Sequence, residues 1–518
     1  MMFFSHFAHS APISELLTSP AAPPAPASTS SSSTSSSNSG TSPHQGWLNT
    51  TRAITAEDMN GRLVLLDFWT YGCINCMQIV PDLNYLEEKY GNKLLIIGVH
   101  SAKFKGEAND ARILSAAQRF GIHHPLINDD FTIWNRLGVR AWPTLILFAP
   151  DGEEIARYSG EGHRDDLDRD IMRFAKLVSN DSDLKSLTPT PQSQSALAFP
   201  ARIKPYDGGF MVADSGHNQI VIFDQNMKET ARIGGGQRGL KDGDFATAQF
   251  NHPRGLTAVN DKIYVADTDN HAVRMIDMTS KTITTLAGNG QRGVNRMLNH
   301  ADAKTISLAS PWDVAVMPGP DGKKSDGQKS EGQPSDGLQL VIASAGLHQL
   351  HLYDFASNTV SLLAGNGGED IIDGPAKSAE LAQPSALQVV GDAVYFLDAE
   401  TSSLRVLKDG KIKTLIGTGL FDFGLKDGLY PNALMQHAQG LTYVPGENGG
   451  QFYIADTYND AIRVYDLGSQ KLSTYQKIAP PNSEPGDVLV KDDKLYIVFT
   501  NQNKIEQSER QSESSSKF

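Results

Sequence analysis

The stretch LVLLDFWTYGCINC, residues 63–76, joins a continuous apolar run to the only two cysteines of a 518-residue chain. A run of this kind is typical of a strand that is covered on both faces. The segment that follows places Ile79, Leu83 and Leu86 at helical spacing, and LLIIGVH at 94–100 has the pattern of a second buried strand. The order of strand, helix and strand predicts a small α/β domain with a mixed sheet.

Further elements extend this domain from about Trp47 to Val178. NDARILSAAQRFG at 109–121 predicts a helix, and FTIWNRLG at 131–138 predicts a shorter one. The segment WPTLILFAPDGEEIARYSG then predicts a hairpin that turns at Pro150-Asp151-Gly152.

The two cysteines lie where the first strand ends and its helix begins. A thiol in the first turn of a helix is more readily a thiolate, because free N–H groups and the helix dipole stabilise an anion there. Cys73 is therefore the candidate nucleophile, and Cys76, three residues on, is placed to resolve a mixed disulfide. Asp67 on the preceding strand would lie beneath the pair and exchange a proton with Cys76.

These residues carry a resemblance. LDFWTYGCINC is similar to the active site of the thioredoxin superfamily, and GVRAWPT resembles that family's cis-proline turn. The insertion between the first helix and this turn is most similar to the thioredoxin-like fold of the peroxiredoxin and TlpA type. The resemblance implies that Trp142 and Pro143 align the backbone of a substrate. The sequence departs from classical thioredoxin at Gly72 and at Ile74-Asn75, which leaves the direction of the redox reaction open.

Other roles for these residues stay open. A zinc site needs four ligands, but there is no second cysteine pair, and His123-His124 has no metal-ligand spacing to the first. The thiols are alternatively inert remnants on a thioredoxin-like fold. Asp67 is equally well explained as a core carboxylate. Trp134 and Trp142 fit either packing or a substrate groove.

A repeat occupies the second half of the chain. Its anchor phrases are FNHPRGL at 250–256, LASPWDV at 308–314, LAQPSAL at 381–387 and MQHAQGL at 435–441, and the period indicates an array or propeller. The anchors, with weaker copies at both ends, are Pro200, Pro253, Pro311, Pro384, Ala438 and Pro485.

Each anchor is followed by a strand, an acidic turn and two further strands, as in IYVADTDNHAVRMID at 263–277. Four strands per repeat is one propeller blade. The ADT-x-N-x-x-R phrases resemble the NHL repeat, and the count predicts six blades. The sixth is incomplete, and we expect a segment within 183–199 to supply its missing strand.

Two recurrent side chains in the repeat are predicted to be structural. Asp242, Asp373 and Asp427 precede glycines in similar loops and are interpreted as turn formers rather than ligands. Arg274, Arg405 and Arg463 fit hydrogen bonding between blades better than catalysis.

The domain boundaries follow from these patterns. The sequence predicts a disordered Ser/Pro/Ala-rich tail at 1–46, a thioredoxin-like domain at 47–178, a linker at 179–195, an NHL-type propeller at 196–507 with a flexible insertion at 318–337, and a disordered tail at 508–518.

Composition narrows the partners. The net charge of −13 disfavours nucleic acid and anionic membranes. No stretch approaches the roughly 20 apolar residues of a membrane span, and MMFFSHFAHSAPISELL at the amino terminus lacks the features of a secretory signal. We therefore expect a cytoplasmic protein, with the periplasm as the less favoured compartment.

A thioredoxin-like domain followed by an NHL propeller, with TYGCINC at its active site, is similar to the NHL repeat-containing protein 2 family over about residues 47–507. Together with the cysteine chemistry, this favours a thiol–disulfide oxidoreductase that uses its cysteine pair and no bound cofactor. Its client or partner protein would bind the propeller face and the groove at the cysteines.

Two rival functions remain. In one, both domains are non-catalytic surfaces of a protein-binding scaffold. In the other, the propeller is an enzyme with a metal in its central channel, as in NHL-type lyases. The histidines His252, His271, His348 and His437 do not share one motif position, so we assign them structural roles and predict no metal site.

Overall fold

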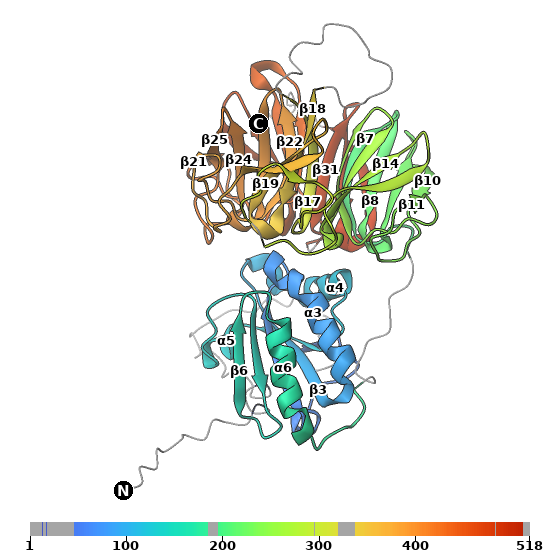
Figure 1. Cartoon of the computed structure of the whole chain (residues 1–518). Coiled ribbons are helices and arrows are strands. Elements are labelled where there is room, and N and C mark those ends of the chain that lie inside the picture. Colours follow the sequence, from blue (N-terminus) through green and yellow to red (C-terminus); the bar gives the residue numbers. More distant parts are fainter. Residues whose placement is uncertain are drawn as a thin grey trace, which may run out of the picture. The chain divides into compact units, whose positions relative to one another are not determined.

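The apolar run at 63–69 forms the central strand β2 of a six-stranded mixed sheet in a computed structural model of the protein (Figure 1). The structure describes Ile13, Leu17 and residues 46–184, 195–294, 296–319, 337–481 and 483–510. The chain divides into two compact units, residues 1–192 and 193–518.

The sheet of the first unit has the strand order β1-β4-β3-β2-β5-β6. Strand β2 pairs with β3 in parallel and with β5 antiparallel, so both of its edges are hydrogen-bonded. The strands are β1 (Trp47–Leu48), β2 (Leu63–Trp69), β3 (Leu94–Ser101), β4 (Leu126–Asp129), β5 (Thr144–Phe148) and β6 (Glu154–Ser159). The α-helices are α2 (Ala56–Met59), α3 (Ile74–Tyr90), α4 (Asp110–Phe120), α5 (Thr132–Arg136) and α6 (Arg164–Phe174).

Helices α3 and α6 cover one face of this sheet (Figure 1). Because successive strand residues point to opposite faces, Leu63 and Leu65 pack under α3, while Val64, Leu66 and Phe68 join a second cluster on the other face. This explains why the run is apolar without alternation: each face of β2 has its own core.

Local signals place the remaining elements where the sequence predicts them. The Asn109 side chain accepts a hydrogen bond from the Arg112 N–H at 3.2 Å and caps α4, which ends at Gly121 in the left-handed conformation. Strands β5 and β6 form the expected hairpin, in which the N–H of Gly152 donates to the Ala149 carbonyl at 2.9 Å.

The first unit extends beyond the predicted range 47–178. Backbone N–H groups of Ser179 and Asn180 donate to the Gly61 carbonyl, and Leu184 packs on the core, so the start of the predicted linker belongs to this unit. Ile13 is buried in the same cluster and Leu17 packs against it, although both fall in the predicted tail. Apart from these two residues and Gly46, the predicted tail lies outside the described residues. Residues 185–194 of the predicted linker lie outside them as well, and Ser195 is described again.

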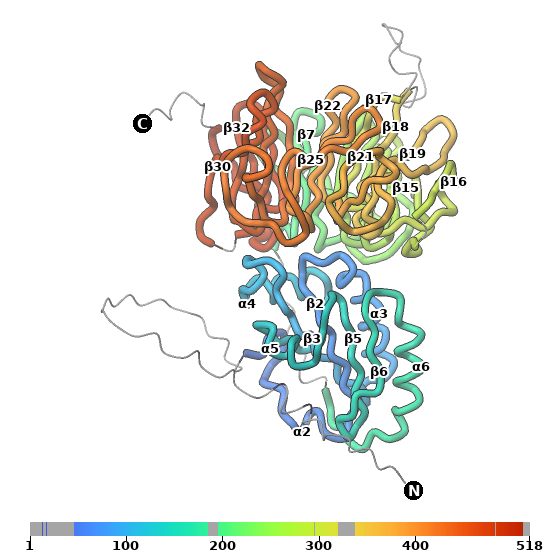
Figure 2. The backbone as a smooth tube through the Cα atoms, turned by 90° about the vertical axis from the view of Figure 1, so that its left-hand side faces the viewer, coloured from blue at the N-terminus to red at the C-terminus, as the bar shows by residue number. Residues whose placement is uncertain are grey.

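The second unit is a six-bladed propeller, as predicted (Figure 2). We number the blades one to six along the chain. Blade one is β7 (Pro200–Tyr206), β8 (Gly209–Asp214), β9 (Gln219–Phe223) and β10 (Glu229–Ile233); blade two is β12 (Pro253–Val259), β13 (Lys262–Asp267), β14 (Ala272–Asp277) and β15 (Thr282–Ala287); blade three is β17 (Pro311–Pro318), β18 (Leu338–Ser344), β19 (Gln349–Asp354) and β20 (Thr359–Ala364). Blade four is β22 (Pro384–Val390), β23 (Ala393–Asp398), β24 (Ser403–Lys408) and β25 (Lys411–Ile416); blade five is β27 (Gly440–Val444), β28 (Gln451–Asp456), β29 (Ala461–Asp466) and β30 (Lys471–Lys477); blade six is β31 (Pro485–Lys491), β32 (Lys494–Phe499) and β33 (Lys504–Glu509).

The predicted carboxyl end of the propeller needs one adjustment. Strand β33 runs to Glu509, two residues beyond the predicted end at 507. The predicted insertion at 318–337 separates β17 from β18, and its residues 320–336 lie outside the described part of the chain, as do residues 511–518 of the predicted tail.

Four blades carry a fifth, two-residue strand that pairs with the fourth strand of the blade. These are β11 (Gly243–Asp244), β16 (Ala301–Asp302), β21 (Gly374–Pro375) and β26 (Gly428–Leu429). Three of the four begin at the glycine of the recurrent Asp-Gly element. The element therefore forms an outer strand and is more than a turn.

A buried arginine forms an ion pair within each of blades two, four and five, as blade four illustrates. The Arg405 guanidinium donates to Asp398 at 2.9 Å and to Asp373 at 3.0 Å, and both Arg405 and Asp398 are fully buried. It also donates to the carbonyls of Glu380 and Ile372. Blades two and five repeat the arrangement with the trios Arg274, Asp267 and Asp242, and Arg463, Asp456 and Asp427.

These contacts correct one prediction. The arginines bind their own blade and the connection that precedes it, rather than the neighbouring blade. Asp242, Asp373 and Asp427 accept from these guanidinium groups and are structural, as the sequence predicts. In blades two, four and five, the recurrence of Asp and Arg in the sequence therefore records an ion pair within the blade.

Hydrogen bonds between blades use a second recurrent position. Asn218 Oδ1 accepts from the His252 N–H at 3.1 Å, and His271 Nδ1 accepts from the Ser310 N–H at 3.1 Å. In the same way, the side chains of Ser402 and Asp460 accept hydrogen bonds from backbone N–H groups that lie just before the first strand of the next blade. Each acceptor residue has a positive φ, which aims its side chain across the junction.

The same bond closes the ring between the last blade and the first. Asn503 Oδ1 accepts from the Phe199 N–H at 2.7 Å, and the Thr500 hydroxyl donates to the Pro200 carbonyl at 2.9 Å. Strands β31 and β7 lie side by side (Figures 1 and 2). Residues 195–199 form no strand, and residues 185–194 lie outside the described part of the chain, so a fourth strand from 183–199 stays a prediction. Among the described residues, side-chain bonds and apolar packing join blade six to blade one.

We expect Arg405→Met to lower the free energy of unfolding of the propeller by about 3–5 kcal/mol, because it leaves the buried Asp398 carboxylate without its cation. Urea unfolding of the full chain, followed by far-UV circular dichroism, measures the change. Lys408→Met removes an exposed cation from the same strand and should change the stability by less than about 0.5 kcal/mol. Equal losses in the two variants would contradict this role of the ion pair.

Candidate functional site

The two cysteines occupy the first turn of α3, as the sequence predicts. Cys73 is the N-cap residue, and its Sγ accepts a hydrogen bond from the Cys76 N–H at 3.2 Å. The two cysteines are not joined by a disulfide, and their exposed fractions are 9% for Cys73 and 1% for Cys76. The Cys73 sulfur therefore faces the unpaired N–H groups of a helix N-terminus, while Cys76 lies inside the protein.

Asp67 lies on the face of β2 that α3 covers, since it alternates with Leu63 and Leu65. It is 2% exposed, and its Oδ1 has no hydrogen-bond partner among the described residues. Burial raises the pKa of Asp67 to about 7, against the opposing charge of His124. The carboxyl is therefore poised to hold or release a proton near neutral pH.

Cys76 is a poor thiolate in this surrounding. Burial raises the pKa of its thiol well above the ordinary value, and the hydrogen bond and charge of Cys73 act in the same direction. The Asp67 charge adds to the effect, whereas a backbone hydrogen bond from Thr70 opposes it. Cys76 thus needs a proton acceptor before it can act as a nucleophile.

Glu107, which the sequence did not single out, holds the loop that precedes Cys73. This buried carboxylate lies in the 3₁₀ turn Lys105–Ala108 and accepts from the Thr70 hydroxyl at 2.7 Å and the Gly72 N–H at 2.8 Å. It also accepts from the Phe104 N–H at 2.9 Å. The surrounding segment has no periodic apolar pattern, so only the folded structure brings it to the site.

His100 at the end of β3 supports the same loop through its ring. The ring stacks on Tyr71 with centroids 5.6 Å apart and meets Trp69 edge-on at 5.0 Å. Burial lowers the pKa of His100 to about 3, so the ring is neutral and packs as an aromatic. It is a second residue of this site that the sequence pattern did not reveal.

The Trp142-Pro143 peptide bond is cis, in agreement with the resemblance to a cis-proline turn. Trp142 is half-buried and packs against Trp134 with ring centroids 4.6 Å apart, and Phe131 completes an aromatic group. This favours packing for Trp134. Substrate alignment by Trp142 and Pro143 stays a prediction.

The centre of the propeller contains a buried arginine. Arg202 on β7 pairs with Asp487 at 3.2 Å and with Asp313 at 3.4 Å, and it donates to the carbonyls of Ser385 and Gln439. Residues from blades three, four, five and six thus converge on one guanidinium from blade one. The inner strands also line a pocket of about 350 Å³, with side chains such as Lys204, Gln388 and Tyr443.

The four propeller histidines singled out in the sequence occupy structural positions. His252 and His437 have positive φ just before the first strand of their blades, while His271 and His348 have positive φ before the third. Among the described residues, no group of three or more His, Cys, Asp or Glu side chains is arranged to hold a metal ion. In the same part of the chain, no helix is both long and apolar enough to cross a membrane.

Comparison with known proteins finds relatives of both units. A family model described as thioredoxin-like matches residues 60–154, and one described as NHL repeat matches residues 250–274. NHL repeat-containing protein 2 of Homo sapiens is 35% identical over 516 residues, which cover 89% of this chain and 68% of that protein.

Two further relatives differ in extent. Protein SUPPRESSOR OF QUENCHING 1, chloroplastic, of Arabidopsis thaliana is 33% identical over 499 residues, 89% of this chain but only 45% of that protein. Thiol-disulfide oxidoreductase ResA of Bacillus anthracis is 27% identical over 118 residues, which cover 23% of this chain and 66% of that protein. The chain therefore spans less than half of the plant relative's length.

We expect Asp67→Asn to stabilise the first unit above neutral pH. Because the pKa of Asp67 is raised to about 7 in the folded state, its contribution to stability is full below its ordinary pKa and is lost as pH rises to about 7. Relative to the native chain, the variant should gain as much as about 3 kcal/mol between pH 5 and pH 8.

Urea unfolding of the reduced protein at the two pH values tests this expectation. Tryptophan fluorescence suits it, since Trp47, Trp69, Trp134 and Trp142 belong to the first unit. Asp165→Asn at an exposed position is the control and should follow the native pH dependence. An Asp67→Asn curve parallel to the native one would contradict a raised Asp67 pKa.

We expect Glu107→Ala to slow the reaction of Cys73 with a small disulfide probe by about ten- to a hundredfold, because the loop before Cys73 loses its acceptor. Glu107→Gln keeps one acceptor oxygen and should be intermediate, and Glu153→Ala at an exposed position should have no effect. Stopped-flow measurement of probe release gives the rates. Native rates in folded Glu107→Ala would rule out this role.

Proposed function

The chain belongs to the NHL repeat-containing protein 2 family, and on this premise we propose that it is a thiol–disulfide oxidoreductase whose propeller binds a client or partner protein. The observation that carries the proposal is the position of Cys73 at the N-terminus of α3, in hydrogen-bond contact with Cys76. The buried Asp67 on the covered face of β2 adds a group that titrates near neutral pH.

The proposed reaction has two steps. In the first, the Cys73 thiolate attacks a client disulfide, so that a bond forms between Cys73 and one client sulfur and the other leaves as a thiolate. In the second, Asp67 takes the Cys76 proton and the Cys76 sulfur attacks Cys73. The intramolecular disulfide forms, the second client thiolate leaves, and two electrons pass to the client.

The environment of the thiols supports this order. Cys73 is the more exposed sulfur and caps the helix, whereas burial holds the pKa of Cys76 high until Asp67 accepts its proton. We also propose that Trp142 and Pro143 align a client backbone, as the resemblance of GVRAWPT to a cis-proline turn implies. The reaction needs no cofactor beyond the cysteine pair. We propose the cytoplasm as the compartment, where the reduced form of such a pair is maintained.

A second candidate function is a protein-binding scaffold without turnover. It is favoured by the pocket of about 350 Å³ that residues from all six inner strands line at the propeller axis. If the protein is a scaffold, Cys73→Ser leaves both the binding of the partner and the cellular effect of the protein unchanged. In the oxidoreductase reading, that substitution abolishes the effect even where binding persists.

We expect Cys76→Ser to accumulate a mixed disulfide on Cys73, because the client sulfur is no longer displaced. The adduct is measured by non-reducing electrophoresis and mass spectrometry after incubation with a disulfide-bonded protein. The variant with both cysteines replaced by Ser is the control and should form none. In the native protein, equilibration against glutathione buffers should show a reversible two-electron transition of the Cys73–Cys76 pair. Absence of both adduct and transition would favour the scaffold.

A further inference from the structure

We propose that His124 and Glu87 form a proton relay that connects the buried Asp67 carboxyl to solvent in a pocket beside α3. The inference rests on the proposed redox function, because the proton it moves is the one that Asp67 takes from Cys76. It assigns roles to two residues that act through Asp67 and do not touch the reacting sulfurs.

Several buried polar atoms without a hydrogen-bond partner first indicate a route for the proton. The buried atoms without a hydrogen-bond partner in the described residues include Asp67 Oδ1, both ring nitrogens of His124, Glu87 Oε2 and Asn84 Oδ1. A buried polar atom without a partner costs about 1–3 kcal/mol, so several of them together need a reason. Ordered water or an exchanging proton supplies one.

The two nitrogens of His124 have different surroundings. Nδ1 lies 3.6 Å from Glu87 Oε1 on α3. Nε2 lies 3.4 Å from the point where a Cβ on Gly98 would stand, and Gly98 is the residue paired with Asp67 across β2 and β3. The absence of a side chain at Gly98 thus leaves room for the His124 ring to approach Asp67.

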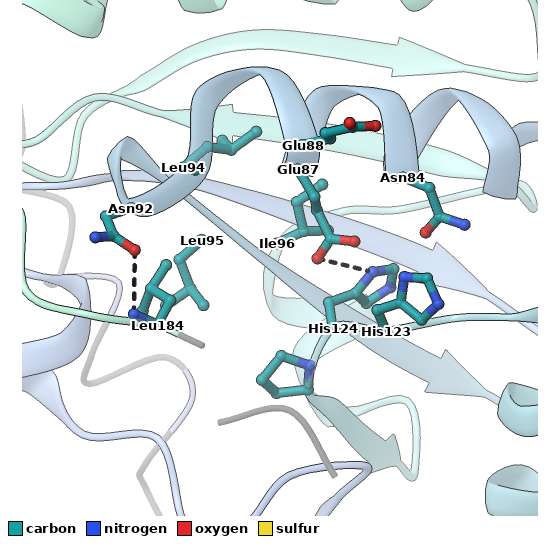
Figure 3. Close-up of a pocket in the computed structure, with 12 residues that line it drawn as sticks. Asn84, Glu87, Glu88, Asn92, Leu94, Leu95, Ile96, His123, His124 and Leu184 are labelled. Atoms are coloured by element: carbon teal, nitrogen blue, oxygen red, sulfur yellow. Dashed lines mark hydrogen bonds and ion pairs between the residues drawn. The ribbon is translucent and has the colours of Figure 1, made fainter. Parts of the chain in front are cut away.

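The pocket provides the exit to solvent. It has a volume of about 470 Å³ and is lined by Asn84, Glu87, His123 and His124, with Leu94 and Ile96 at its floor (Figure 3). The side chain of Glu87 is 24% exposed and that of His124 only 1%. Asp67 does not line the pocket, whereas His124 does, and the charge of His124 acts on Asp67. At 3.6 Å, the last transfer suits a bridging water.

The groups around Asp67 fit this direction of transfer. The charges of Cys76 on α3 and of His124 before β4 both interact with Asp67. Burial raises the pKa of Asp67 to about 7, and the charge of His124 acts against the rise. A carboxyl with a pKa near the operating pH can both take and release a proton.

In the forward reaction the proton leaves the Cys76 sulfur as Cys76 attacks Cys73 in the mixed disulfide. Asp67 receives it and passes it to His124 Nε2, and the Nδ1 proton leaves for the Glu87 carboxylate and pocket water. The sulfur chemistry remains that of the two-step exchange: the Cys73–Cys76 bond forms, the Cys73–client bond breaks, and the client thiolate takes a proton from solvent.

The sequence offers matched controls beside both relay residues. His124→Gln is compared with His123→Gln, whose ring is exposed, and Glu87→Gln is compared with the exposed Glu88→Gln. The reduced full-length protein is mixed with oxidised glutathione, and release of the second glutathione reports the attack by Cys76. We expect His124→Gln to slow this release at least tenfold at pH 7, and Glu87→Gln several-fold, with both controls within twofold of the native rate.

Two readouts separate a relay from a structural role. In the relay, added imidazole restores the rate of His124→Ala, and His124→Gln causes no further loss in an Asp67→Asn background. Carboxyl-region infrared titration of the reduced protein should show the Asp67 pKa raised in His124→Gln and unchanged in His123→Gln. Additive losses of rate, or equal titrations in the two glutamine variants, would overturn the relay.

The titration also separates failure of the relay from failure of the proposed function. If the native protein never reacts with glutathione while the Asp67 titration still shifts in His124→Gln, the coupling of the two residues stands and the redox proposal falls. If the native protein reacts and Glu87→Gln and His124→Gln match their controls at every pH, the redox proposal stands and the relay falls.

Discussion

A carboxylate withdrawn from water must find hydrogen-bond donors inside the protein, and this requirement organises both units. In the first unit Glu107 collects two backbone N–H groups and a hydroxyl, which fixes the loop before Cys73. In the propeller, Asp398 collects two bonds from the Ala382 N–H and one from Arg405. The same chemistry thus shapes a reactive loop in one unit and a repeated blade in the other.

Asp67 departs from this rule, and the departure is what gives it chemical interest. The carboxylate oxygens of Glu107 and Asp398 accept hydrogen bonds from fixed donors, whereas Asp67 Oδ1 accepts none from the described residues. A carboxyl that is buried but not satisfied can change its protonation state without dismantling a network. Structure and reactivity therefore use the same side-chain type, and the number of donors within reach decides between them.

The sequence predicted the features that depend on neighbouring residues. The apolar run at 63–69, the cysteines after it and the capped helix at 109–121 are read from local pattern, and the structure has each of them. The repeat predicted six blades because one phrase recurs, although blade three has Ser344 and His351 where others have Asp and Arg.

The sequence did not predict contacts made across long separations. Glu107 lies 35 residues beyond Gly72 in a polar segment, and the relation of His124 to Asp67 depends on the parallel pairing that brings Gly98 beside β2. Arg202 joins carbonyl and carboxyl groups from four other blades, and no other anchor phrase has an arginine two residues after its anchor. Local pattern specifies elements, but the charges buried between elements follow only from the completed fold.

The closure of the propeller has a consequence for the order in which the chain folds. The bond between Phe199 and Asn503 spans 304 residues, and Ile203, Phe210 and Val212 of blade one share a cluster with Leu489 and Val498 of blade six. During synthesis, the apolar edge of blade one stays uncovered until blade six has been made. A contact of such long range is slow to form, so ring closure sets the last and most aggregation-exposed step of folding.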